Sequence, residues 1–259
     1  MGVLVAAFAV FFVLPFAGLI TRAIEGDRAT WDLATSPVAR DALVLSLWTS
    51  SVTVVLAVMF GTPVAYVLAR VSFPGRSLCD ALIDLPIVLP PTVAGVALLT
   101  AFGRRGLIGE PVEAWTGFTF GFRTLAVIMA QTLVAAPFYV RAARAGFSAV
   151  DPQFERVAYT LGASRLRAFF RILVPQARSA MLAGVVLCWA RAMGELGATL
   201  IFAGSLQGST QTMPLAILGA FESSNGLTGA VALSLVLLGV ALVALWLFRV
   251  VAQRKESEG

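Results

Sequence analysis

Long apolar stretches alternate with short polar ones along this chain of 259 residues. A helix needs about 20 consecutive apolar residues to cross the hydrocarbon core of a bilayer. Six stretches reach roughly that length, so the sequence predicts an all-α integral membrane protein with six transmembrane helices in one transmembrane domain, residues 1–259. The predicted spans cover residues 3–20, 42–69, 81–102, 124–144, 179–203 and 226–250.

Prolines and short apolar runs modify this simple pattern. Gly61 and Pro63 predict a kink in the second span, and Pro90 and Pro91 predict that the third is broken. Such a break survives in a membrane only where neighbouring protein satisfies the freed backbone groups. The apolar run of residues 213–221 is too short to cross, so it is predicted to be a re-entrant or interfacial helix.

Composition supports a membrane location. Hydrophobic residues make up 59% of the chain and charged residues 13%, against about a quarter charged in soluble domains. The net charge of +5 therefore reflects membrane topology, and no nucleic acid partner is predicted. Because Lys and Arg concentrate on the side that holds residues 148–178 and both termini, these parts are predicted to be cytoplasmic. The apolar N-terminus lacks a basic leading region, which favours an uncleaved first span.

The stretch of residues 148–178 predicts two short amphipathic helices separated by Gly162. Neither helix can span a bilayer, so the stretch either lies on the membrane surface or docks into another protein. Asp151 and Ser164 are predicted to cap the two helices, Gly162 to take a positive φ, and Pro175 to close the unit. Apolar residues recur with helical spacing at Phe154, Val157, Ala158 and Leu161, and again at Leu166, Phe169, Phe170 and Leu173.

This stretch resembles the cytoplasmic coupling loop of permeases of ATP-binding cassette (ABC) importers, whose usual form is E-A-A, three residues, G, nine residues, I-x-L-P. Ala158, Gly162 and the run from Ile172 to Pro175 keep that spacing. Arg156 stands at the usual Glu, and Glu155 lies one residue early. A displaced Glu of this kind resembles the molybdate branch, and so do the runs at residues 85–99, 191–205 and 210–217.

The resemblance implies a membrane-spanning subunit of an importer for an oxyanion, with molybdate or tungstate preferred and sulfate as the main alternative. A secondary transporter that works alone is a more distant alternative. The implied partners are a second permease copy, two cytoplasmic ATPase subunits and an external oxyanion-binding protein. The residues expected to couple to the ATPase are Phe154, Glu155, Val157, Ala158, Leu161, Gly162, Ala163, Ser164, Leu166, Phe169, Ile172 and Pro175.

Few residues are suited to chemistry. A nucleotide-binding P-loop needs a lysine within a glycine-rich motif, and the only lysine is Lys255 in the C-terminal tail. ATP and Mg²⁺ are therefore expected on the partner ATPase, and no cofactor on this chain. With no histidine and two isolated cysteines, the sequence predicts neither a catalytic residue nor a metal site.

Polar residues within the spans are candidates for the translocation pathway. Arg191 and Glu195 lie four residues apart, which fits either a functional site or a mutual pair that holds helix packing. The uncharged candidates fit either a pathway or ordinary interhelical hydrogen bonds. The pathway candidates are Thr92, Thr100, Gln131, Thr132, Glu195 and Thr199.

Overall fold

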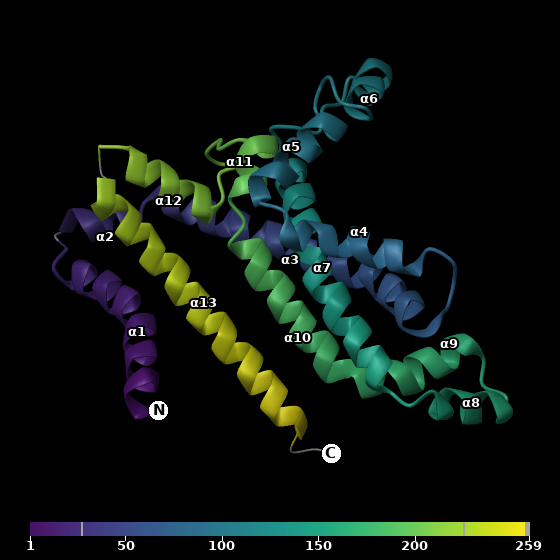
Figure 1. The fold of residues 1–259 in the computed structure, drawn as a ribbon. Helices are drawn as coiled ribbons and strands as arrows, with labels where there is room; N and C mark the ends of the chain where they lie inside the picture. The colour runs from purple at the N-terminus through teal and green to yellow at the C-terminus, as the bar shows by residue number, and fades with distance from the viewer. Residues whose placement is uncertain (27, 225, 257–259) are drawn as a thin grey trace. The chain divides into compact units, whose positions relative to one another are not determined.

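The structure is a computed structural model that describes residues 1–26, 28–224 and 226–256 (Figure 1). Every regular element in these residues is a helix, which confirms the all-α fold class. The helices form two compact units, one of Leu47–Thr210 and one of Met1–Ser46 with Gln211–Gly259. Each unit has a hydrophobic core of its own.

The larger unit contains most of α3 and all elements from α4 to α11. Their bounds are α3 (Pro37–Arg70), α4 (Arg76–Val88), α5 (Pro91–Phe102), α6 (Gly109–Thr116), α7 (Thr124–Ala149), α8 (Pro152–Thr160), α9 (Arg165–Ala168), the π-helix η1 (Phe169–Leu173), α10 (Val174–Met193) and α11 (Gly197–Ala203). The smaller unit contains α1 (Gly2–Ile24), α2 (Arg28–Ala34), the start of α3, α12 (Met213–Glu222) and α13 (Gly226–Glu256).

Five helices are long and apolar enough to cross a membrane, and a sixth span results if α4 and α5 count as one bent pair. The chain bends by 116° between these two helices, which confirms the predicted break in the third span. The helix α3 continues through Pro63 without ending. The five long helices cover Gly2–Ile24, Trp31–Arg70, Thr124–Ala149, Arg165–Met193 and Gly226–Phe248.

The predicted fifth span of residues 179–203 is wrong at both ends. Pro175 does not close the preceding unit, because α9, η1 and α10 run on as one helical stretch from Arg165 to Met193. The π turn of η1 ends at Leu173, two residues before Pro175, and the wider turn accommodates a residue that cannot donate a backbone hydrogen bond. At the other end the helix stops at Met193, and α11 begins only at Gly197.

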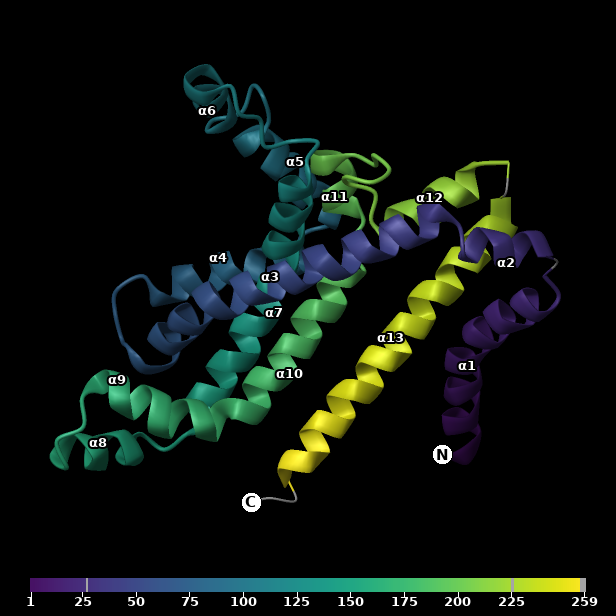
Figure 2. The ribbon, with the colours of Figure 1, turned by 180° about the vertical axis from the view of Figure 1, so that it is seen from behind.

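Small residues let α7 and α10 pack closely side by side (Figures 1 and 2). A Cβ atom added at Gly146 on α7 would lie 2.7 Å from the Cβ of Ala180, and one added at Gly184 on α10 would lie 2.8 Å from the Cβ of Ala142. Because helices in lipid gain no hydrophobic driving force from pairing, such close van der Waals contact is their main source of association.

Two hydrogen bonds fix α3 against α7 in the same core. Thr53 donates to the amide oxygen of Gln131 at 3.2 Å, and the hydroxyls of Thr62 and Tyr139 lie 2.6 Å apart. Tyr139 is fully buried. Its ring also occupies the space that a side chain at Gly61 would need. The larger unit is therefore organised around α7, with α3 and α10 packed against it.

The smaller unit packs α13 against α12, α2 and α1. Its core contains Met213 and Leu233 with small residues of α3. The Ser46 hydroxyl accepts a hydrogen bond from the Met213 amide at 2.8 Å, which satisfies the first turn of α12. The short helix predicted at residues 213–221 is confirmed as a helix.

The packing of α7 on α10 predicts that Gly146→Leu destabilises the larger unit by about 1–3 kcal/mol, because the added side chain overpacks the contact with Ala180. The expected result is a lower midpoint of unfolding for the purified chain in detergent. Gly18→Leu on α1 is the matched control, since nothing lies within 4 Å of a Cβ at that position. Equal midpoints for the two variants would contradict the packing argument.

Candidate functional site

The coupling segment, residues 148–178, contains α8, α9 and η1 between the end of α7 and the start of α10 (Figure 2). The Asp151 carboxylate accepts a hydrogen bond from the Gln153 amide at 2.8 Å. The Ser164 hydroxyl accepts one from the Arg167 amide at 3.3 Å. Both predicted caps are confirmed, so the local sequence sets where α8 and α9 begin.

Gly162 has φ +81°, which confirms the predicted positive value. Its amide donates to the carbonyl of Tyr159 at 3.0 Å, and the next amide, of Ala163, donates to the carbonyl of Ala158 at 2.9 Å. This pair of bonds is the Schellman motif, which ends a helix through a left-handed glycine. The turn between α8 and α9 therefore depends on a backbone conformation that other residues rarely adopt.

The large apolar side chains of α8 are exposed and do not pack against the rest of the larger unit. Phe154 is 54% exposed, Val157 57% and Leu161 82%, and only Ala158 of the predicted apolar face is buried. An amphipathic helix of a self-contained protein would bury this face. These side chains are thus available to another surface.

The coupling segment has two arms, a first arm formed by α8 and a second arm formed by α9 and η1. The predicted apolar face of the second arm is partly buried and partly exposed. Leu173 is buried and Phe169 half-buried in the core that contains α7, whereas Leu166 is 71% and Phe170 61% exposed. Among the remaining predicted coupling residues, Ala163 and Ile172 are half-buried, and Gly162, Ser164 and Pro175 are exposed. The segment therefore anchors itself through η1 and presents Leu166 and Phe170 outward.

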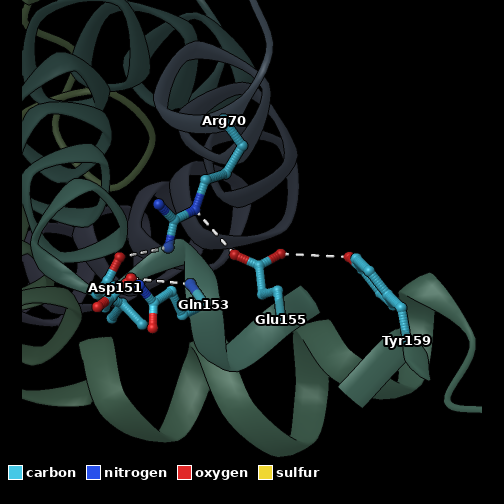
Figure 3. Close-up of polar contacts among 6 residues, drawn as sticks. Arg70, Asp151, Gln153, Glu155 and Tyr159 are labelled. Carbon is cyan, nitrogen blue, oxygen red and sulfur yellow. Dashed lines mark hydrogen bonds and ion pairs between the residues drawn. The ribbon is translucent and has the colours of Figure 1, made fainter. Parts of the chain in front are cut away.

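Glu155 is the charged residue that α8 turns inward (Figure 3). Its Oε1 lies 2.9 Å from Nε of Arg70, the last residue of α3. The Arg70 Nη2 also donates to the carbonyl of Val150 at 2.7 Å. The Tyr159 hydroxyl donates to Oε2 of Glu155 at 3.3 Å. These contacts attach the first arm of the coupling segment to the end of α3.

The Tyr159 hydroxyl remains a donor in this arrangement. Burial raises the pKa of Tyr159 above its usual value, and the neighbouring Glu155 carboxylate raises it further. Sequence reasoning placed Glu155 in the coupling segment but did not single out Arg70 as its partner. The available signal was the position of Arg70 at the end of a long apolar helix.

Glu195 lies in the break between α10 and α11. Its Oε2 is 2.7 Å from Nη1 of Arg191, so the two residues form the mutual pair that was one of the two interpretations of their spacing. Its Oε1 accepts a hydrogen bond from the Ala198 amide at 2.8 Å. The prediction that both charges lie on one helix is wrong, because the helix ends at Met193 and Glu195 belongs to the following turn. The buried carboxylate thus forms an ion pair with an arginine and accepts a hydrogen bond from the first turn of α11.

The other pathway candidates fall into two groups. Thr92 and Thr100 on α5 are exposed, and Thr199 on α11 is fully buried. On α7, Gln131 is buried in its bond with Thr53, and Thr132 is half-buried.

The breaks before α5 and α11 come close together. A Cβ atom at Gly197 would lie 3.0 Å from the Cβ of Pro91 and 3.2 Å from the Thr92 amide nitrogen. The structure therefore brings Thr92 to the same region as the start of α11, while Thr100 lies two turns further along α5. In the described ranges, no three Asp, Glu or Cys side chains come together as metal ligands. The roles of these residues in translocation stay predictions.

The chain resembles known transport proteins over most of its length. It is 39% identical over 217 residues to the molybdenum transport system permease protein ModB of Escherichia coli (strain K12), covering 82% of this chain and 95% of that protein. ModB of Mycobacterium tuberculosis (strain ATCC 25618 / H37Rv) is 42% identical over 232 residues, covering 90% and 86%. The probable sulfate transport system permease protein cysT of Chlorokybus atmophyticus is 35% identical over 235 residues, covering 90% and 82%.

The fold is also found in a solved structure. A bacterial ABC transporter involved in the import of the acidic polysaccharide alginate contains a chain with TM-score 0.72 and 17% identity, covering 96% of this chain and 92% of that one. Residues 57–257 match the family model for the binding-protein-dependent transport system inner membrane component. These findings, together with the apolar helices, identify a multi-pass membrane protein, and the chain belongs to the family of binding-protein-dependent transport system inner membrane components.

Proposed function

We propose that this chain is the permease subunit of an ATP-driven importer that carries molybdate or tungstate into the cytoplasm. The observation that carries this proposal is its 39% identity to a molybdenum transport permease of which it covers 95%. The runs at residues 85–99, 191–205 and 210–217 support the same branch. The substrate would pass through the membrane in a complex of two permease copies, with delivery by an external binding protein.

The exposed apolar residues of the coupling segment are suited to bind a cytoplasmic ATPase subunit. Phe154, Val157, Leu161, Leu166 and Phe170 are each more than half exposed. Exposed apolar side chains that gather on one segment are typical of sites that bind another protein. Because the chain lacks a P-loop motif, two such partner subunits would bind and hydrolyse ATP with Mg²⁺. The remaining predicted coupling residues would set the backbone shape of this surface.

Sulfate is the alternative substrate, favoured by the 35% identity to a probable sulfate permease. Molybdate, tungstate and sulfate are all tetrahedral dianions, so a pathway of hydroxyl and amide groups suits each of them. A stand-alone transporter coupled to an ion gradient would need a carboxylate that is free to bind the ion. Glu195 already contacts Arg191 and the Ala198 amide, which argues against this second class.

The substrate proposal predicts that cells lacking this gene lose uptake of radiolabelled molybdate and tungstate at submicromolar concentration. Each oxyanion is supplied separately, and sulfate uptake is measured in parallel as the matched control. Restoring the gene should restore molybdate and tungstate uptake. Retained molybdate uptake with lost sulfate uptake would instead assign the protein to the sulfate branch.

The turn at Gly162 predicts a loss of coupling in Gly162→Val. A β-branched residue at φ +81° costs roughly 1–2 kcal/mol, so the turn should distort and molybdate uptake should fall about tenfold. Gly162→Asn is the control, since Asn tolerates the left-handed region best among residues with a side chain. Uptake is measured in cells together with membrane content of the chain. Normal uptake in the Val variant would show that the conformation of this turn is not needed for coupling.

The proposed orientation places the coupling segment and both termini in the cytoplasm, as the distribution of basic residues indicates. Single cysteines at Leu107 and Leu161, which are 86% and 82% exposed, test it on a Cys79→Ser, Cys188→Ala background. In vesicles stripped of peripheral subunits, an impermeant maleimide should label Leu107→Cys only from outside and Leu161→Cys only from inside. The reverse pattern would invert the topology.

A further inference from the structure

Arg70 joins the end of a membrane helix to two points of the coupling segment at once. Its Nε faces the Glu155 carboxylate at 2.9 Å, and its Nη2 donates to the Val150 carbonyl at 2.7 Å. The Arg70 and Glu155 side chains are only 12% and 9% exposed. A planar guanidinium can bind a carboxylate and a carbonyl in fixed directions, which an ammonium group does less well.

The neighbouring turn of α3 binds the other arm of the coupling segment. Tyr66 lies four residues before Arg70, on the same helical face. The Tyr66 ring centroid is 5.1 Å from that of Phe169 in η1 and 6.3 Å from that of Phe147 near the end of α7. The last two turns of α3 thus contact the first arm through charge and the second arm through aromatic packing.

The first arm has few other attachments. In α8 only Glu155 and Ala158 are buried, and its large apolar residues are exposed. A helix of nine residues is too short to be stable without tertiary contacts. The buried ion pair is therefore the contact that decides whether α8 keeps a fixed position on α3.

We propose that Arg70 is the positioning residue of the coupling segment, which holds α8 rigidly on the end of α3 so that displacement of α8 moves the membrane helices. This inference rests on the proposed role of α8 in binding an ATPase. Without the Arg70 contacts, α8 moves independently of α3. ATP hydrolysis then continues while the number of oxyanions imported per ATP falls.

The test uses the complete complex of permease, ATPase and binding protein in lipid nanodiscs and proteoliposomes. Arg70→Met is expected to raise amide hydrogen exchange in residues 152–160 about tenfold, the size expected for a lost charged hydrogen bond. Molybdate imported per ATP hydrolysed should fall by a similar factor. Arg104→Met is the matched control, because it removes another arginine ion pair, the one between Arg104 in the loop before α6 and Glu113 in α6. It should leave both measurements unchanged.

Arg70→Lys keeps the charge and removes the planar fork, so it tests the geometry if the Met variant fails to assemble. It should assemble and raise exchange in α8 about threefold, with a smaller loss of import per ATP. Wild-type exchange in α8, or wild-type import per ATP, in a variant that assembles would overturn the proposal. The exchange measurement needs no substrate, so a wild-type complex that imports sulfate instead would revise the proposed function and leave this test valid.

Discussion

The close packing of α7 on α10 is the constraint on which the larger unit depends. Gly146 and Gly184 bring the two helices so near that a single added carbon would overlap a neighbouring alanine. These are the helices that lead into and out of the coupling segment. Because their ends are fixed relative to each other, the segment between them has a defined span, and its two short arms can take up one arrangement.

Polar groups stabilise the irregular backbone next to the helices that small residues pack together. In lipid, a break in a helix leaves backbone groups that water cannot satisfy. Glu195 resolves this at the start of α11, where one carboxylate binds both the Arg191 guanidinium and the Ala198 amide. At the end proposed above to be cytoplasmic, Arg70 similarly makes two contacts, an ion pair with Glu155 and a hydrogen bond to the Val150 carbonyl. In both places a single charged pair orders irregular backbone.

Sequence reasoning predicted features that depend on local chemistry. The caps at Asp151 and Ser164, the positive φ of Gly162 and the break at Pro90 each follow from what one residue can do with its own backbone. The break after Met193 contains no proline, and its local signal is Gly194 directly after the helix; the Glu195 side chain that stabilises it does so through a contact that the sequence pattern does not reveal. Likewise, helical periodicity identified the apolar face of α8 but could not tell whether that face meets the protein's own core or a partner.

The continuity of α9, η1 and α10 has a mechanical consequence. Within this stretch α10 alone has 20 residues, Val174–Met193, so it is about 30 Å long at the usual rise per residue. The exposed Leu166 and Phe170 lie just before its first residue, and its last residue stops beside Glu195. A helix of this length converts a tilt of about 5° at its first end into a displacement of about 3 Å at its second. That distance is about the length of a hydrogen bond, so a small rotation at one end is enough to rearrange contacts at the other.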